Sequence, residues 1–262
     1  MKKGALLHNA KAVYVITYRE FRKFIREKSR LLGTMARPIL WLFVVGGGMG
    51  RLIKPGGNVS YTQFIFPGMI GLTILFASIF SAISIVWDRE FGFLKEILVS
   101  PISRFSIVFG KAMAGTTISL FQVLLMVIFI PILGIKITFV QFFLLLFSAG
   151  LLAFALTSLG ILVASRMASY EGFNIIMNFL VMPMFFLSGA MYPVKLLPPA
   201  LKMITHFNPL TYGVDAMKNV LLSNAAGNVM GPEYPLGLDL AVVSGFLVVM
   251  VVLANHSFRR AG

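Results

Sequence analysis

The chain has 262 residues, of which 58% are hydrophobic and 12% are charged, and its formal net charge is +14. Soluble domains carry about 25% charged residues because water must solvate their surface, so this composition excludes a soluble globular protein. The sequence contains no cysteine, which excludes disulfide bridges and thiolate metal sites. The basic excess follows membrane topology and does not indicate a nucleic-acid partner.

The first segment, residues 1–31, predicts an amphipathic helix that lies at the membrane interface. Apolar residues recur at helical spacing from Val13 to Phe24, while basic side chains fall mainly on the opposite face. A basic helix with aromatic residues on its apolar face tends to lie among lipid head groups; a soluble helix packed on a partner is the alternative. The segment lacks the apolar block and cleavage site of a signal peptide, so we expect no removal. The basic residues assigned to the interfacial helix are Arg19, Arg22 and Arg26.

Six stretches predict membrane-spanning helices, because a helix needs roughly 20 apolar residues to cross the hydrocarbon core. Most of them fall in long gaps that contain no Asp, Glu, Lys or Arg. The first holds Arg37 and Arg51 near its ends, where long side chains can reach the interface. We expect residues 32–262 to form one all-α integral membrane domain. Its spans are predicted near Leu32–Ile53, Phe64–Val86, Ile107–Leu133, Phe139–Ala164, Phe173–Met191 and Leu238–Phe258.

Residues 192–236, between the fifth and sixth spans, differ in character because they contain six prolines. Two short apolar patterns, around Leu201 and around Val220, predict helices that are too short to span the bilayer. We expect them to be amphipathic or re-entrant helices packed on the membrane domain.

The basic residues predict the orientation of the chain. With the N-terminus inside, 17 of the 23 Lys and Arg residues fall on the cytoplasmic side and 6 fall outside. Both termini are therefore expected in the cytoplasm, and residues 192–236 are expected on the extracellular side.

No group of residues suggests catalysis, a metal site or a bound cofactor. The three histidines lie in separate segments, and no carboxylate falls near the middle of a predicted span, which argues against a proton-driven pump. The only Gly-Lys pair, Gly110-Lys111, lacks the earlier glycine and the following Ser or Thr of a phosphate-binding loop. The chain is therefore not expected to be an enzyme or to hydrolyse ATP through that motif.

The densest mixture of charges lies in the predicted cytoplasmic segment 88–104. Phe91, Leu94 and Ile97 mark one face of a short helix, which Pro101 then ends. An ordinary loop helix on the bilayer would have the same pattern. Charges of both signs concentrated in one loop nevertheless favour docking to a polar protein surface.

Several short motifs follow one another from the N-terminus to the last span: Arg19-Glu20, Arg26, Arg30, Pro38, Trp41, Pro67-Gly68, Asp88–Gly92, Ser100–Arg104, Gly110-Lys111, Asn208–Tyr212 and Asp215–Lys218. In this order the sequence resembles the permease subunits of type-2 ABC exporters, the class that includes bacterial drug, polysaccharide and lipo-oligosaccharide exporters. The resemblance covers nearly the whole chain.

The resemblance implies a half-transporter of the inner (plasma) membrane that pairs with a second copy of itself. Each copy would bind a separate ABC-type ATPase subunit, which would hold ATP and Mg²⁺, so that this chain binds no cofactor. Segment 88–104 would be the coupling helix that enters a cleft of the ATPase. The residues implied in this coupling are Asp88, Arg89, Glu90, Phe91, Leu94, Glu96 and Ser100.

Four residues are candidates for the dimer seam or the transport pathway. Gly46 and Gly50 form a small-xxx-small pattern in the first span, for which helix bending or packing within the chain is the alternative. Asn174 and Asn178 lie in the predicted fifth span, where hydrogen bonds between helices are the alternative.

The expected function is ATP-driven export of a hydrophobic or amphipathic compound, an expectation motivated by the scarcity of buried charge. Export of a polysaccharide or glycolipid is the nearest alternative. An ATP-independent channel or secondary carrier is the alternative from another class, and an enzyme acting on lipid is a third.

Overall fold

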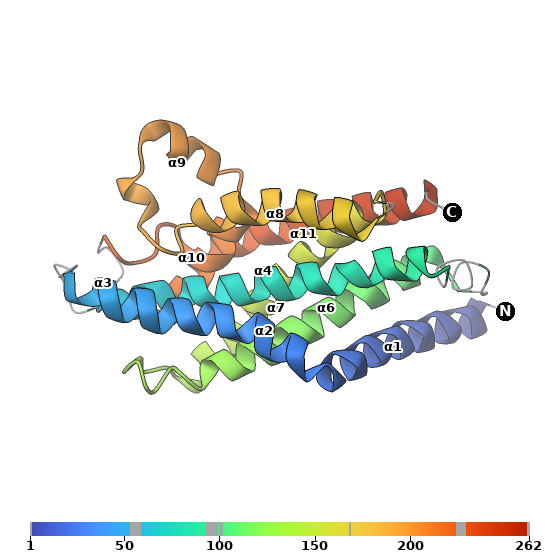
Figure 1. The fold of residues 1–262 in the computed structure, drawn as a ribbon, viewed down its shortest axis with the longest axis horizontal. Helices are drawn as coiled ribbons and strands as arrows, with labels where there is room; N and C mark the ends of the chain where they lie inside the picture. The colour runs from blue at the N-terminus through green and yellow to red at the C-terminus, as the bar shows by residue number, and fades with distance from the viewer. Residues whose placement is uncertain are drawn as a thin grey trace.

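The computed structural model describes residues 2–52, 59–92, 99, 102–167, 169–223 and 229–260 (Figure 1). Every regular element in these residues is a helix, which confirms the predicted all-α class. The elements are α1 (Lys2–Arg26), α2 (Lys28–Leu40), the π-helical turn η1 (Trp41–Val45), α3 (Gly46–Leu52), α4 (Tyr61–Glu90), α6 (Arg104–Val127), α7 (Phe139–Ala164), α8 (Tyr170–Phe186), the 3-10 turn η2 (Val194–Leu196), α9 (Pro199–Thr205), α10 (Pro209–Leu221) and α11 (Leu236–Arg260).

Five helical stretches are long and apolar enough to cross a membrane, so the chain is a multi-pass membrane protein. They are Lys28–Gly50, Tyr61–Glu90, Arg104–Val127, Phe139–Ala164 and Leu236–Phe258.

The predicted fifth span, Phe173–Met191, is shorter in the structure. Helix α8 ends at Phe186, and Gly189 then adopts a positive φ of 71°. With 17 residues, α8 is about 25 Å long at a rise of about 1.5 Å per residue. Figure 1 shows α8 running alongside the spans, and both termini lie at one end of the bundle. Because an even number of crossings returns a chain to its starting side, this arrangement favours α8 as a sixth crossing. We call the end that carries both termini the terminal end, and the opposite one the far end.

Local sequence explains where the spans begin. Helix α4 starts with a capping box in which the Ser60 hydroxyl accepts from the Gln63 backbone N–H and Gln63 Oε1 accepts from the Ser60 N–H. Thr138 and Gln141 repeat this arrangement at the start of α7. These caps satisfy backbone donors that would otherwise have no partner.

Helix α4 lies at the centre of the bundle and packs against α2, α6, α7, α8 and α10. Between Phe64 and Val86, the side chain of Phe80 alone is not buried. Association of helices in lipid depends on close packing of small residues, because lipid tails are as apolar as the side chains. A Cβ added to Gly68 would lie 2.6 Å from the Ala190 backbone, so the chain after α8 approaches α4 at a point where glycine is required.

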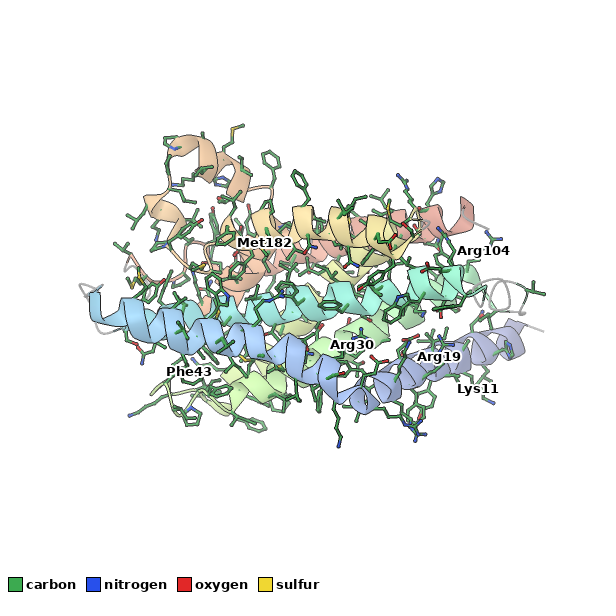
Figure 2. The ribbon with its side chains drawn as sticks, viewed as in Figure 1. Lys11, Arg19, Arg30, Phe43, Arg104 and Met182 are labelled. Carbon is green, nitrogen blue, oxygen red and sulfur yellow. The ribbon has the colours of Figure 1, made fainter. Side chains whose placement is uncertain are left out.

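The sequence predicted that helix α1 lies in the head-group plane. In the structure it runs lengthwise along α6 (Figure 1), and its placement relative to the membrane stays a prediction. Asn9 meets Ser103, Thr17 meets Gly110, and Phe24 packs on Phe121. The helix ends at Arg26, before the predicted boundary at residue 31. Its outward face exposes both aromatic and basic side chains, including Tyr14, Tyr18 and Arg22, and Figure 2 labels Lys11 on the same helix.

The segment 192–236 contains the two predicted short helices, which differ in environment. Helix α9 projects from the bundle (Figure 1) and exposes apolar side chains such as Met203. In α10 every side chain except that of Asn219 is buried, against α4, α7 and α11. Only the second helix is therefore an integral part of the bundle.

We expect Gly68→Val to destabilise the protein by about 1–3 kcal/mol, because the new side chain would overlap the Ala190 backbone. The measurement is the thermal unfolding midpoint of the purified protein in mild detergent. Gly245→Val is the matched control, since Gly245 is exposed and a Cβ there has no atom within 4 Å. Equal midpoints for Gly68→Val and the unsubstituted protein would contradict the packing described.

Candidate functional site

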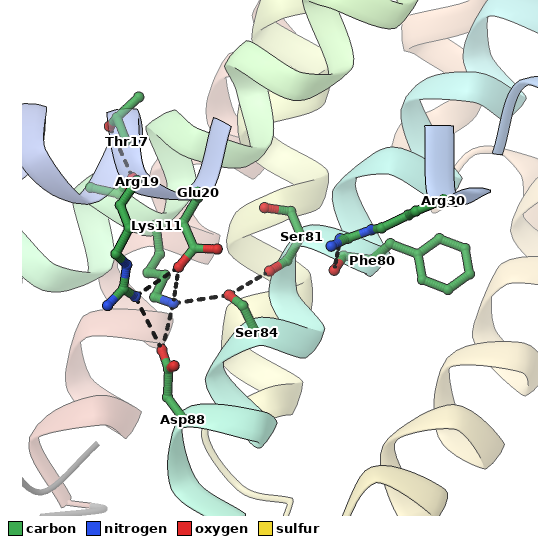
Figure 3. A network of polar contacts seen from close by, with 10 residues as sticks. Thr17, Arg19, Glu20, Arg30, Phe80, Ser81, Ser84, Asp88 and Lys111 are labelled. Carbon is green, nitrogen blue, oxygen red and sulfur yellow. Dashed lines mark hydrogen bonds and ion pairs between the residues drawn. The ribbon is translucent and has the colours of Figure 1, made fainter. Parts of the chain in front are cut away.

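A buried charge cluster joins three helices at the terminal end (Figure 3). Lys111 of α6 donates to Glu20 of α1 over 2.8 Å and to Asp88 of α4 over 2.7 Å. Its third hydrogen bond goes to the hydroxyl of Ser84 over 2.9 Å. Only 4% of the Lys111 side chain is exposed. We call Glu20, Ser84, Asp88 and Lys111 the charge cluster.

Arg19 brings a second cation to the charge cluster. Its guanidinium lies 2.8 Å from Glu20 and 3.7 Å from Asp88, so two carboxylates face two cations. Burial alone would raise the pKa of the Glu20 carboxyl. The charge of Lys111, together with hydrogen bonds from Lys111 and Arg19, outweighs burial, and the pKa of Glu20 is lowered. Glu20 is therefore ionised at neutral pH.

Arg89, the next residue of α4, connects the last turn of that helix to the end of α7. Its two terminal nitrogens donate to the backbone carbonyls of Ser165 and Met167, each over 2.8 Å. The Ser165 hydroxyl bonds to Ser257 of α11 over 2.8 Å, and Arg166 also donates to Ser257. The last turn of α4 is thereby linked to α7 and, through α7, to α11.

Aromatic contacts extend these links to a further helix. Trp87 of α4 stacks on Tyr170 at the start of α8, with ring centres 6.0 Å apart. The Lys23 ammonium of α1 lies 4.9 Å from the centre of the Trp87 ring, a cation–π distance. On the other side of segment 88–104, Asn9 accepts from the backbone N–H of Ser103. Helix α1 therefore contacts both ends of that segment.

The end of α4 also presents unburied side chains to solvent. Glu90 is exposed, and Phe91 is 81% exposed even though it is a large apolar side chain. Gly92 follows with a positive φ of 78°, so the chain turns sharply there. Of the residues predicted to couple to an ATPase, Asp88, Arg89, Glu90 and Phe91 come together at this turn. Leu94, Glu96 and Ser100 lie outside the described residues.

The other predicted site residues lie elsewhere. Arg22 and Arg26 are exposed on α1. Gly46 is buried against α4: its carbonyl accepts from Thr62, and an added Cβ would lie 3.0 Å from that side chain. This contact supports packing within the chain at Gly46, whereas Gly50 is exposed.

The two asparagines of α8 have different surroundings. Asn174 is half-buried and donates to the Tyr170 carbonyl of the same helix, whereas Asn178 is exposed among apolar neighbours. A pathway role for either residue stays a prediction.

A second buried polar group lies at the far end and was missed by the sequence analysis. The Asp215 carboxylate accepts from the backbone N–H groups of Glu233 and Tyr234 at 2.8–2.9 Å. Lys218 donates to the Gly189 carbonyl over 2.7 Å, and Asp239 is fully buried. The scarcity of buried charge, which motivated a hydrophobic cargo, is therefore less pronounced than the sequence suggested.

The buried charges at the terminal end were also missed, although the pattern contained a signal. Glu20 falls on the same stripe of α1 as Thr17 and Phe24, and Lys111 falls between Val108 and Ala114 on the buried face of α6. A charged residue on the otherwise apolar stripe of a helix requires a partner of opposite charge.

The polar contacts at the terminal end connect helices to one another. Among the residues that the structure describes, no group of three or more His, Asp or Glu side chains is placed to hold a metal ion. The charge cluster and the Arg89 contacts instead make the last turn of α4 a point where a displacement would reach α1, α6, α7 and α8 together.

Comparison with known proteins agrees with the motif pattern. The sequence model of the ABC-2 type transporter family matches residues 11–222. A transport permease, ycf38 of Cyanophora paradoxa, is 31% identical over 244 residues, covering 92% of this chain and 84% of that protein. Nodulation protein J of Rhizobium leguminosarum bv. viciae is 30% identical over 236 residues, covering 88% of this chain and 86% of that protein.

We expect Lys111→Met to lower the free energy of unfolding by up to about 3–5 kcal/mol, because Glu20 and Asp88 would lose their buried cation and keep only the half-exposed Arg19. Thermal unfolding in mild detergent measures the change. Lys136→Met, at an exposed lysine, is the control and should leave the midpoint unchanged. A Lys111→Met protein as stable as the control would rule out an energetic role for the charge cluster.

The lowered pKa of Glu20 predicts a pH dependence. Because the folded-state pKa lies below the ordinary value of 4.5, ionised Glu20 stabilises the fold above that pH. This contribution is lost as the pH falls through the lowered pKa. We expect Glu20→Gln to be less stable than the unsubstituted protein at neutral pH, with a difference that shrinks below pH 4.5. Unfolding midpoints over this range provide the measurement. Glu171→Gln, at an exposed residue, should show no such trend.

Proposed function

The chain belongs to the ABC-2 type transporter family, and from this premise we propose that it is the membrane half-transporter of an ATP-driven exporter. Two copies would pair in the inner (plasma) membrane, and each would bind a separate ABC-type ATPase subunit at the terminal end. The ATPase subunits would bind ATP and Mg²⁺, while this chain forms the pathway.

One observation carries the proposal: the last turn of α4 is both exposed and connected. Glu90 and Phe91 offer a charged and an apolar side chain for docking. The adjacent Asp88 and Arg89 bond to α1, α6 and the end of α7. An ordinary surface loop would also be exposed, but it would not be bonded to several helices of the bundle. A force applied by a partner at this turn would be shared by most of the bundle.

The proposed mechanism is a population shift between two states of the helices. The terminal end would face the cytoplasm, as the distribution of basic residues predicts. Closure of two ATPase subunits around ATP would displace segment 88–104 of each copy. The charge cluster would carry α1 along with α4 and α6, and the bundle would change between inward-open and outward-open arrangements.

A second copy is proposed to lie against the faces of α2 and α8 that are uncovered in the single chain. Leu40 and Val44 are 60% and 66% exposed on the first span, and Ile175 and Phe179 are 71% and 82% exposed on α8. Close packing of the pair would be aided by Gly47, where an added Cβ meets no atom within 4 Å.

The cargo is proposed to be a hydrophobic or amphipathic compound. Asn178 lies among exposed apolar residues of α8, which supports an amphipathic cargo over a purely hydrophobic one. Export of a polysaccharide or glycolipid is the nearest alternative. An ATP-independent channel or secondary carrier is the alternative that needs no partner.

Purification from the native host in mild detergent, followed by mass spectrometry, tests the proposal. The expected result is an ABC-type ATPase in a one-to-one ratio with this chain. A stable dimer of this chain alone, which transports after reconstitution without nucleotide, would support the channel or carrier and contradict the proposal.

We expect Glu90→Arg to weaken binding of the ATPase by about tenfold or more, because it reverses a charge at the proposed docking surface. Glu90 is exposed, so the unfolding midpoint should not change. The measurement is the amount of ATPase retained on the immobilised chain as salt is raised. Lys136→Glu reverses a charge at the far end and is the matched control. If both variants retain equal amounts of the ATPase, Glu90 is not part of the docking surface.

A further inference from the structure

A pocket of about 290 Å³ lies between the first span and α4. It is lined by Arg30, Gly33, Thr34, Arg37, Phe76 and Phe80. Two cations and two aromatic rings thus face a space large enough for a small polar group and part of a tail. Phe80 is the residue at which the otherwise continuous burial of α4 is interrupted.

The depth of the pocket follows from its place on α4. With 30 residues, this helix is about 45 Å long, which is the thickness of a bilayer including its head groups. Phe76 is at the middle of the helix, and Phe80 is about one turn closer to the terminal end. With α4 centred in the bilayer, the pocket lies within the hydrocarbon core, in the half nearer the terminal end.

The charges that line the pocket are not balanced by the residues that the structure describes. Arg30 lies 3.3 Å from the Glu27 carboxylate and donates to the Phe80 carbonyl over 2.6 Å (Figure 3). The guanidinium of Arg37 lies 4.3 Å from the centre of the Phe76 ring, and no carboxylate is within ion-pair distance of it in the described part of the chain. One carboxylate thus faces two cations.

The sequence predicted that Arg37 reaches the interface, whereas the depth inferred from the length of α4 places its guanidinium deeper than that. Its guanidinium stays over Phe76, at the middle of α4. An arginine at this depth is costly unless it pairs with an anion or serves a ligand. A guanidinium binds planar anions through paired N–H groups, which favours phosphate or carboxylate over a neutral sugar.

We propose that this pocket binds the anionic head group of an amphipathic cargo, a phosphate or carboxylate, while its apolar tail extends along the rings of Phe76 and Phe80. The inference rests on the proposed function, because it assigns a chemical class to the compound that is exported. A resident membrane lipid keeps its head group at the bilayer surface. At the depth of Phe76, the source of an anionic group is a molecule that is being moved across.

A substitution at Gly33 can place a carboxylate inside the pocket itself. It lines the pocket one helical turn before Arg37, and an added Cβ would meet no atom within 4 Å. In Gly33→Glu, the new carboxylate can pair with Arg37 at i,i+4 spacing. Gly33→Gln is the matched control, because it adds nearly the same volume without the charge.

The experiment is photolabelling of the full chain in phosphatidylcholine nanodiscs. The probe is decyl phosphate with a diazirine beside the head group, and its neutral counterpart is the corresponding decanol. We expect mass spectrometry to find the phosphate probe on peptides of α2 and α4. Gly33→Glu and Arg37→Gln should each lower this labelling by about tenfold or more. Gly33→Gln should be labelled well above Gly33→Glu, because it adds nearly the same volume without the charge, and Arg22→Gln should be labelled like the unsubstituted chain. Labelling by decanol should not differ between Gly33→Glu and Gly33→Gln.

Three outcomes would overturn the proposal. Equal labelling of Gly33→Glu and Gly33→Gln would show that charge does not determine binding. Equal labelling by the phosphate and decanol probes would show an apolar pocket only. Full suppression of labelling by phosphatidylglycerol in the disc would assign the pocket to a membrane lipid. If Arg37→Gln does not fold, the two Gly33 variants suffice.

Failure of this inference is distinguishable from failure of the proposed function. A chain that retains its ATPase but is not labelled would refute the pocket alone. A chain that is labelled but recruits no ATPase would refute the half-transporter and leave the anion site in place.

Discussion

A lysine on the buried face of a membrane helix must meet carboxylates, because neither lipid nor the protein interior can solvate its charge as water does. Lys111 is such a residue, and its two carboxylates come from α1 and α4. Much of the terminal end follows from this requirement. Because Glu20 pairs with Lys111, helix α1 is held against α6 and runs along it.

Helix α4 takes part both in the charge cluster and in the close packing of the bundle. Its first half is held by close contacts with small residues, such as Gly68 with Ala190, and these leave little room for sliding. Its last turn is held by polar contacts, which can rearrange more readily than interlocked side chains. A chain built in this way can keep one part of α4 rigid while the terminal end moves, which is the division of roles that the proposed mechanism requires.

Much of the fold could be predicted from the sequence, and the parts that could not depend on long-range contacts. Gaps between charged residues predicted most of the five helices that are long and apolar enough to span a membrane, since the hydrocarbon core excludes charge over a known length. The end of α8 was predicted too late, because the positive φ of Gly189 depends on the contacts that the following segment makes. Three of the four residues of the charge cluster were quoted as motif residues, but Glu20 and Lys111 are 91 positions apart, and no local pattern predicts that they meet. The position of Arg37 over the Phe76 ring likewise depends on where α4 places its aromatic side chains.

The polar contacts of α10 have a consequence for biosynthesis. Lys218 donates to the carbonyl of Gly189, which precedes it in the chain and is synthesised before it. Asp215 instead accepts from the backbone N–H groups of Glu233 and Tyr234, which follow it in the chain. While a ribosome makes the intervening residues, Asp215 has no such partners and α10 is not yet secured. These contacts can therefore form only after the residues just before α11 have been synthesised. A chain that stalls before residue 233 would carry a carboxylate on α10 without the backbone donors that satisfy it in the complete fold.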